Sequence, residues 1–89
     1  MKSRTTRRFR NQLQTLPDSV QQQAKKAYQR FKANPWHNAL CFKQVHPTRP
    51  IYSVRVTKGY RAVGKRDDKG VLWFWIGSHV DYDELIRHY

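Results

Sequence analysis

The spacing of the apolar residues changes at residue 40, and this change constrains the fold more than any other feature of the sequence. Residues 9–33 place apolar side chains at helical intervals, whereas from residue 40 onward apolar and polar side chains alternate with the period of a strand. Helices followed by a run of strands are typical of the α+β class, in which helices cover a face of an antiparallel sheet. We therefore expect an α+β domain with an N-terminal helical layer.

The N-terminal third predicts two helices that form a hairpin. Phe9, Leu13 and Leu16 recur at i, i+4 and i+7, which indicates a short amphipathic helix. Asp18, preceded by proline, supplies the start signal of a second helix, and the sequence Ala-Asn-Pro at 33–35 ends it. The apolar face of this second helix is formed by Val20, Ala24, Ala27, Tyr28 and Phe31.

The remainder predicts four antiparallel strands and a final helix. Turn-forming Pro, Gly and Asp residues separate the strands, which we place at 40–46, 51–57, 60–67 and 71–79. The final helix is expected at 81–89, with Asp81 at its start and Glu84 three residues later, as in a capping box. Because 89 residues provide one compact core, we expect a single domain, residues 1–89. Its helical hairpin packs on a four-stranded, mainly antiparallel sheet with a short C-terminal helix.

The loop lengths predict which side chains share a face of the sheet. If both hairpin loops have three residues and end on a left-handed glycine, Arg55 faces Arg61 and Lys65 faces Trp73. One face is then almost wholly apolar and packs on the helical hairpin; it carries Tyr52, Val54, Val56, Tyr60, Ala62, Gly64, Leu72, Phe74 and Ile76. The other, open face carries Ser53, Arg55, Arg61, Val63, Lys65, Trp73, Trp75, Gly77 and His79. A two-residue loop would shift this register.

The open face interleaves aromatic rings with cations. Such a surface lets nucleobases stack and phosphates pair with Lys or Arg. We therefore predict RNA binding by Lys65, Trp73 and Trp75 of this face and by Lys58 in the basic turn. The alternative is that the tryptophan rings only cover the stems of neighbouring cations through cation–π contact.

The charge of the chain indicates an anionic partner. Lys and Arg total 18 against 6 Asp and Glu, for a formal net charge of +12, and residues 19–66 contain no carboxylate. The expected partner is a polyanion or an acidic protein. A lone cysteine, Cys41, and no apolar run of membrane-spanning length favour a cytoplasmic protein. The four His and one Cys show no metal-binding spacing, so neither a metal site nor a cofactor is expected.

The segment YSVRVTKGYRAVGKRDDKGVLWFWIGSHVDYDELI, residues 52–86, resembles the RelE/ParE superfamily of type II toxin–antitoxin toxins. The resemblance rests on an Arg followed by Gly-Tyr-Arg, a basic turn, a hydrophobic strand ending in Gly-x-His, and a nearby Tyr. With the order of the elements it covers nearly the whole chain. It implies either a ribosome-dependent endoribonuclease that cleaves mRNA in the A site or a DNA gyrase inhibitor, in each case neutralised by a cognate antitoxin, which the charge predicts to be acidic.

The resemblance also implies site residues. Arg61 matches the arginine of the family's Tyr-Arg strand, and Arg55 matches the arginine of the preceding strand. Lys43 matches the basic position on the first long strand, which implies that it binds RNA. His79 and Tyr82 match the strand-end histidine and the following tyrosine of several mRNA-cleaving members. Members with a catalytic glutamate in the middle of the sheet have no counterpart here.

The same residues suit RNA cleavage on chemical grounds. Metal-free cleavage needs a base for the 2′-hydroxyl proton, cations for the phosphorane-like transition state and an acid for the departing 5′-oxygen. Histidine transfers protons near neutral pH, and arginine presents a planar fork to phosphate oxygens. The predicted catalytic residues are Arg55, Arg61, His79 and Tyr82. Asp81 or Asp83 is expected to orient His79.

The leading interpretation is therefore a type II toxin that acts as a ribosome-dependent mRNA endoribonuclease. The second is a non-catalytic toxin that binds DNA gyrase. The third is an RNA- or ribosome-binding module without nuclease activity, which the missing glutamate permits.

Overall fold

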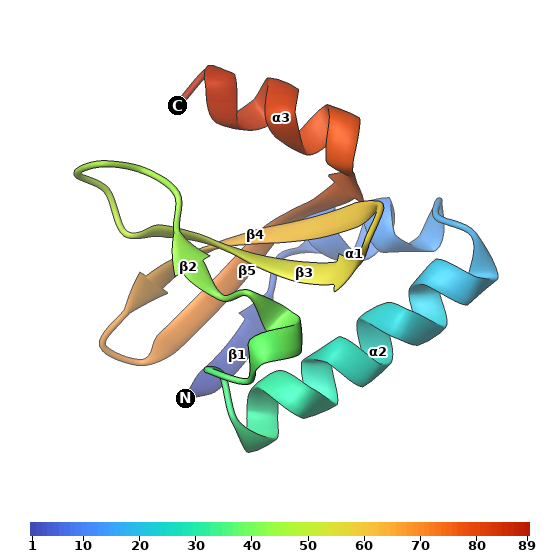
Figure 1. The fold of residues 1–89 in the computed structure, drawn as a ribbon, viewed down its shortest axis with the longest axis horizontal. Helices are drawn as coiled ribbons and strands as arrows, with labels where there is room; N and C mark the ends of the chain where they lie inside the picture. Colours follow the sequence, from blue (N-terminus) through green and yellow to red (C-terminus); the bar gives the residue numbers. More distant parts are fainter.

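In the computed structural model, which describes residues 1–89, a five-stranded sheet lies between two helical layers. Helices α1 and α2 cover one face of the sheet and α3 lies across the other (Figure 1). The elements are β1 (Lys2–Thr5), α1 (Arg7–Gln14), α2 (Asp18–Ala33), the short 3-10 helix η1 (Asn38–Leu40), β2 (Lys43–Gln44), β3 (Ile51–Thr57), β4 (Tyr60–Asp67), β5 (Gly70–Ser78) and α3 (His79–Arg87). The predicted α+β class and helical hairpin are confirmed. No helix is both long and apolar enough to span a bilayer.

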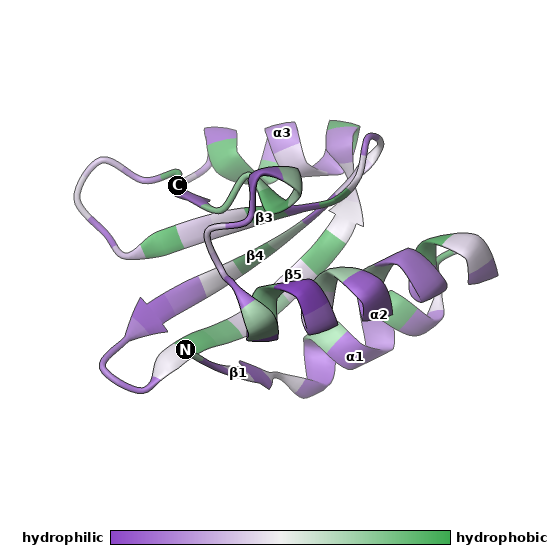
Figure 2. Ribbon diagram, turned by 60° about the horizontal axis from the view of Figure 1, so that its bottom comes forward, coloured by the Kyte–Doolittle hydropathy of each residue, from purple (hydrophilic) through white to green (hydrophobic).

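The sheet contains a fifth strand that the sequence analysis missed. Its strand order is β1-β5-β4-β3-β2, and β1 runs parallel to β5 whereas the other neighbours are antiparallel. Strand β1 has four residues, mostly polar, and it pairs with a segment almost seventy positions away, from Lys2 with Gly70 to Thr5 with Trp73. Figure 2 shows β1 as mostly hydrophilic, which suits an edge strand.

The strand predicted at 40–46 is mostly not a strand. Asn38–Leu40 forms the 3-10 helix, and Cys41 takes a left-handed conformation with φ of 48°. Only Lys43–Gln44 pairs with β3. Leu40 is completely buried, so its apolar character reflects core packing rather than strand alternation.

The two β-hairpin loops have two residues each, rather than the three expected. In the first hairpin a register shift next to Arg55 compensates, and Arg55 faces Arg61 as predicted. In the second hairpin the shorter loop changes the register, so Lys65 pairs with Leu72 and the predicted pairing with Trp73 is wrong.

Strand β5 regains the predicted register through one extra residue. Val63 pairs with Trp75, but its neighbour Gly64 pairs with Trp73, which leaves Phe74 without a partner in β4. Such a bulge breaks the alternation of side chains along the strand. Trp73 and Trp75 therefore lie on opposite faces of the sheet.

Trp73 and Trp75 are buried in two different cores. Trp73 is 4% exposed and lies beneath α1 and α2, in a core formed with Phe9, Ala27, Phe31, Leu40, Phe42, Val54, Ala62, Val71 and Ile76. Trp75 is 6% exposed and packs with Ile51 and Val63, against which Phe74 and two α3 side chains, Tyr82 and Leu85, are half-buried. The expectation that both tryptophans lie on an open face and that Phe74 lies in the helical core was wrong.

Helix α1 continues the edge of the sheet where β1 ends. The backbone N–H of Thr6 donates to the carbonyl of Trp73 over 3.0 Å. The N–H of Ile76, beyond the reach of β1, donates to the side-chain oxygen of Gln12 over 3.1 Å. These two bonds satisfy backbone donors near the bulge and hold α1 beside β5.

Trp73→Ala should destabilise the fold by about 3–5 kcal/mol, because it empties a buried aromatic site and removes the indole donor to the Ser3 hydroxyl. Phe74→Ala should cost roughly half as much, because Phe74 is only half-buried. Urea unfolding followed by circular dichroism measures both. A larger loss for Phe74→Ala would contradict the bulge.

An ion pair joins β1 to the β4–β5 turn. Arg4 Nη2 donates to Asp67 Oδ2 over 2.9 Å. This hydrogen bond, followed by one from the backbone N–H of Lys69, lowers the pKa of Asp67 below its ordinary value of 3.8. The pair is exposed to solvent, so its contribution to stability is small.

The sign of this shift predicts a pH dependence. A carboxyl whose pKa is lowered in the folded state stabilises the fold above its ordinary pKa and loses that contribution as the pH falls through the lowered value. Wild type should therefore be more stable than Asp67→Asn above about pH 5, and the difference should shrink as the pH falls below the ordinary pKa and through the lowered one. Thermal melts across this range test it. Adding Asp67→Asn to Arg4→Gln should change little; a full additional loss would show that Arg4 is not the cause.

Candidate functional site

The predicted catalytic residues meet at one end of the sheet, where the β3–β4 turn contacts the start of α3. The backbone N–H of His79 donates to the carbonyl of Gly59 in that turn over 2.7 Å. Arg55 pairs with Arg61, and Arg61 pairs with Gly77 of β5. Directly paired residues share a face, so both arginines lie on the α3 face beside this junction.

Helix α3 begins two residues earlier than predicted. Ser78 is its N-cap, and the Ser78 hydroxyl accepts a hydrogen bond from the backbone N–H of Asp81 over 3.2 Å. Serine is a strongly preferred N-cap residue, and the negative charge of an acidic residue in the first turn interacts favourably with the helix dipole. The expected cap at Asp81 was wrong, and His79 stands in the first turn rather than at a strand end.

The imidazole of His79 is accessible and has two neighbours on α3. Its Nε2 lies 3.5 Å from Asp83 Oδ2, so Asp83, rather than Asp81, is placed to orient it. The ring of Tyr82 lies nearly parallel to the His79 ring, with centroids 6.3 Å apart. The His79 side chain is 52% exposed, which leaves it open to a large substrate.

Tyr82 connects α3 to the sheet. Its hydroxyl lies 3.4 Å from the hydroxyl of Ser53, which is buried in β3. The Tyr82 ring packs against the core around Trp75. These contacts hold the phenol over the same sheet face as Arg55, two residues along β3 from Ser53.

The two arginines differ in how they are held. Arg61 Nη1 donates to the carbonyls of Thr57 and Tyr60 over 2.8 and 3.1 Å, which keeps its guanidinium at the β3–β4 turn. Its other nitrogens make no hydrogen bond in the structure, and a guanidinium has five donors in all. Arg55 is half-buried, and neither arginine forms an ion pair. Two uncompensated cations thus lie side by side on the α3 face.

The predicted RNA-binding residues are only partly brought together. Lys58 is exposed in the β3–β4 turn. Lys43 in β2 pairs with Ser53, which precedes Arg55 by two residues in β3. Lys65 pairs with Ile51, at the other end of β4. Trp73 and Trp75 are buried, as described above, which removes them as stacking surfaces.

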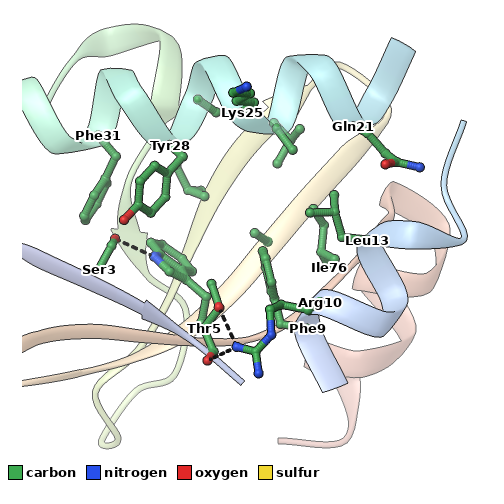
Figure 3. Close-up of a pocket in the computed structure, with 16 residues that line it drawn as sticks. Ser3, Thr5, Phe9, Arg10, Leu13, Gln21, Lys25, Tyr28, Phe31 and Ile76 are labelled. Atoms are coloured by element: carbon green, nitrogen blue, oxygen red, sulfur yellow. Dashed lines mark hydrogen bonds between the residues drawn. The ribbon is translucent and has the colours of Figure 1, made fainter. Parts of the chain in front are cut away.

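An apolar cavity of about 380 Å³ lies on the opposite face, between α1, α2 and the sheet (Figure 3). Its only charged lining residues are Arg10 and Lys25. Arg10 Nη1 donates to the carbonyl and the hydroxyl of Thr5 over 2.8 and 3.0 Å. The apolar faces of these helices were expected to be filled core, but Tyr28, on the predicted apolar face of α2, lines the cavity and is 43% exposed.

The α3 face therefore combines groups able to transfer protons with cations able to bind a phosphate. His79 and Tyr82 provide an imidazole and a phenol, and Arg55 and Arg61 provide the cations. No three His, Cys, Asp or Glu side chains converge anywhere in the chain.

Comparisons with known proteins identify relatives of this fold. A family model described as the ParE-like toxin domain matches residues 18–84. The RelB-RelE antitoxin-toxin complex from Methanococcus jannaschii gives a TM-score of 0.75 at 12% identity, over 92% of this chain and 96% of that chain. YafQ from E. coli strain BL21(DE3) gives 0.72 at 10% identity, over 91% and 96%. The isolated E. coli RelE toxin gives 0.61 at 20% identity, over 98% and 97%. No curated protein sequence matches the chain.

Proposed function

The chain belongs to the ParE-like toxin domain family, and we propose that it is a type II toxin that cleaves mRNA on the ribosome. The expected membership of the RelE/ParE superfamily is confirmed. One observation carries the proposed activity: His79, Tyr82, Arg55 and Arg61 come together at the junction of the β3–β4 turn and α3. Action on ribosomes places the protein in the cytoplasm.

The proposed reaction is attack of the RNA 2′-hydroxyl on the adjacent phosphorus. The 2′-oxygen forms a bond to phosphorus while the bond to the 5′-oxygen breaks, and one proton leaves the nucleophile as another reaches the leaving group. His79 transfers a proton, oriented by Asp83, and Tyr82 acts as a second proton carrier or as a stacking surface. Arg55 and Arg61 stabilise the charge that develops on the non-bridging oxygens.

RNA reaches this site along the basic α3 face. Lys58 is exposed in the turn beside His79, and Lys43 extends the row of cations toward the β2 edge. Each such contact with a phosphate adds a salt-dependent increment to binding. Lys65 is the outermost of the proposed cations, because it lies at the far end of β4.

His79→Gln and Arg55→Ala should each reduce mRNA cleavage at least about a hundredfold, because each removes a proton carrier or a charge stabiliser while leaving the cores intact. Arg61→Ala should have a similar effect, and Tyr82→Phe a smaller one because the ring remains. Primer extension on transcripts after pulsed expression measures cleavage, and circular dichroism checks folding. His88→Gln, at the C-cap of α3 and nine positions from His79, is the matched control and should cleave normally.

A DNA gyrase inhibitor remains the second candidate, because the resemblance to the RelE/ParE superfamily also implies that activity. A supercoiling assay run beside primer extension separates the two activities. Full toxicity of His79→Gln, with intact transcripts and inhibited supercoiling, would favour gyrase. RNA binding without either activity would favour the non-catalytic module.

We further propose a cognate acidic antitoxin as the protein partner. Solved structures of similar fold include the antitoxin-toxin complexes of M. jannaschii and Pyrococcus horikoshii OT3. The apolar cavity between α1 and α2 suits apolar side chains of such a partner, and Arg10 and Lys25 suit its carboxylates. The net charge of +12 adds long-range attraction.

Lys25→Glu should weaken antitoxin binding by about tenfold and reduce its salt dependence, because it reverses one of the two charges that line the cavity. Lys26→Glu makes the same charge change at the neighbouring position, which does not line the cavity, and is the matched control. Isothermal titration calorimetry at two salt concentrations measures both. Equal effects of the two substitutions would show that only net charge matters and that the cavity is not the docking site.

A further inference from the structure

Trp36 is an exposed aromatic residue that the proposed cleavage site does not use. It lies in the link between α2 and η1 and is 56% exposed, whereas the other two tryptophans are buried. Arg66 lies against the Trp36 ring. We propose that Trp36 and Arg66 form a second RNA contact, in which an unpaired base stacks on the indole and the guanidinium binds the adjacent phosphate. The identity of the polymer as RNA rests on the proposed function.

The Trp36 ring is held in place by its surroundings. Its ring centroid lies 5.0 Å from that of Phe42, and Phe42 is buried and stacks on Tyr52 at 4.9 Å. The backbone N–H of Trp36 donates to the side-chain oxygen of Asn34 over 3.1 Å, which fixes the start of the link. A fixed, exposed ring loses little conformational entropy when a base stacks on it.

Arg66 supplies a fixed charge at the same place. Its Cζ lies 5.5 Å from the ring centroid of Trp36 and 5.4 Å from that of Tyr52, and Nη1 donates to the Tyr52 hydroxyl over 3.2 Å. Arg66 forms no ion pair with a carboxylate. The guanidinium keeps donors for a phosphate, and a cation beside an aromatic ring is typical of surfaces that bind single-stranded nucleic acid.

The second contact is separate from the cleavage site. Arg66 follows Arg61 by five positions in β4, a strand distance of about 17 Å, and its side chain lies with Tyr52 against the core of the α1 and α2 face. The cleavage site lies at the other end of β4 and on the α3 face. Two contacts at this separation fit an extended strand of several nucleotides or a folded RNA that touches both faces of the protein.

The burial of Trp73 and Trp75 gives a direct optical test. The full chain with His79→Gln is titrated with a ten-nucleotide oligoadenylate, so that binding is measured without cleavage. Stacking should quench the fluorescence of the accessible Trp36, and Trp36→Leu should abolish the quenching and weaken binding at least about fivefold, as measured by fluorescence anisotropy. Trp36→Tyr should retain most of the affinity, and Arg66→Gln should lower the salt slope by about one.

The controls separate this inference from the proposed function. Tyr28→Leu removes another exposed aromatic residue and should leave the affinity unchanged. Unchanged affinity in Trp36→Leu and Arg66→Gln, or no binding of the oligomer at all, would overturn the second contact, and so would quenching by an acidic peptide but not by RNA. Failure of wild type to cleave transcripts would overturn the nuclease instead and would leave the binding measurement valid.

Discussion

One extra residue in β5, Phe74, gives each face of the sheet its own tryptophan. Trp73 packs beneath α1 and α2, and Trp75 supports α3. The glycines make room for them: a Cβ at Gly64 would lie 2.8 Å from the Trp73 ring, and one at Gly77 would lie 2.8 Å from the Trp75 ring. Without the bulge both rings would be on one face, and the other layer would lose its core. The position of α3, and with it that of the site, depends on this arrangement.

The α3 face of the sheet has an apolar half, against which the helix packs, and a cationic half, whose charges have no counter-ion in the chain. The apolar half is the cluster around Trp75, which α3 covers with Tyr82 and Leu85. The cationic half contains Arg55 and Arg61, which form no ion pair although both are half-buried. Partly desolvated cations without a counter-ion favour binding of an anion. The same property suits a phosphodiester, the substrate of the proposed cleavage.

The sequence predicted those features that depend on local periodicity. Helix spacing located both N-terminal helices, and alternation located β3, β4 and β5. The Arg55–Arg61 pair was predicted from a three-residue loop, but it forms through a two-residue loop with a compensating register shift. The missed features depend on contacts between distant segments. Strand β1 is short and polar and pairs with a segment almost seventy positions away, and the bulge at Phe74 is defined by the pairing of Trp73 with Gly64 in the neighbouring strand. No local pattern distinguishes an apolar helix face that fills a core from one that lines a cavity.

The central claim is that the α3 face cleaves RNA through the substrate's own 2′-hydroxyl. The chemistry of the new RNA ends tests it most directly, because attack by the 2′-oxygen and attack by water leave different termini. We predict a 2′,3′-cyclic phosphate or 3′-phosphate on one fragment and a 5′-hydroxyl on the other, with cleavage that persists in EDTA once the magnesium that the ribosome needs is restored. Fragments with a 5′-phosphate and a 3′-hydroxyl would contradict the account.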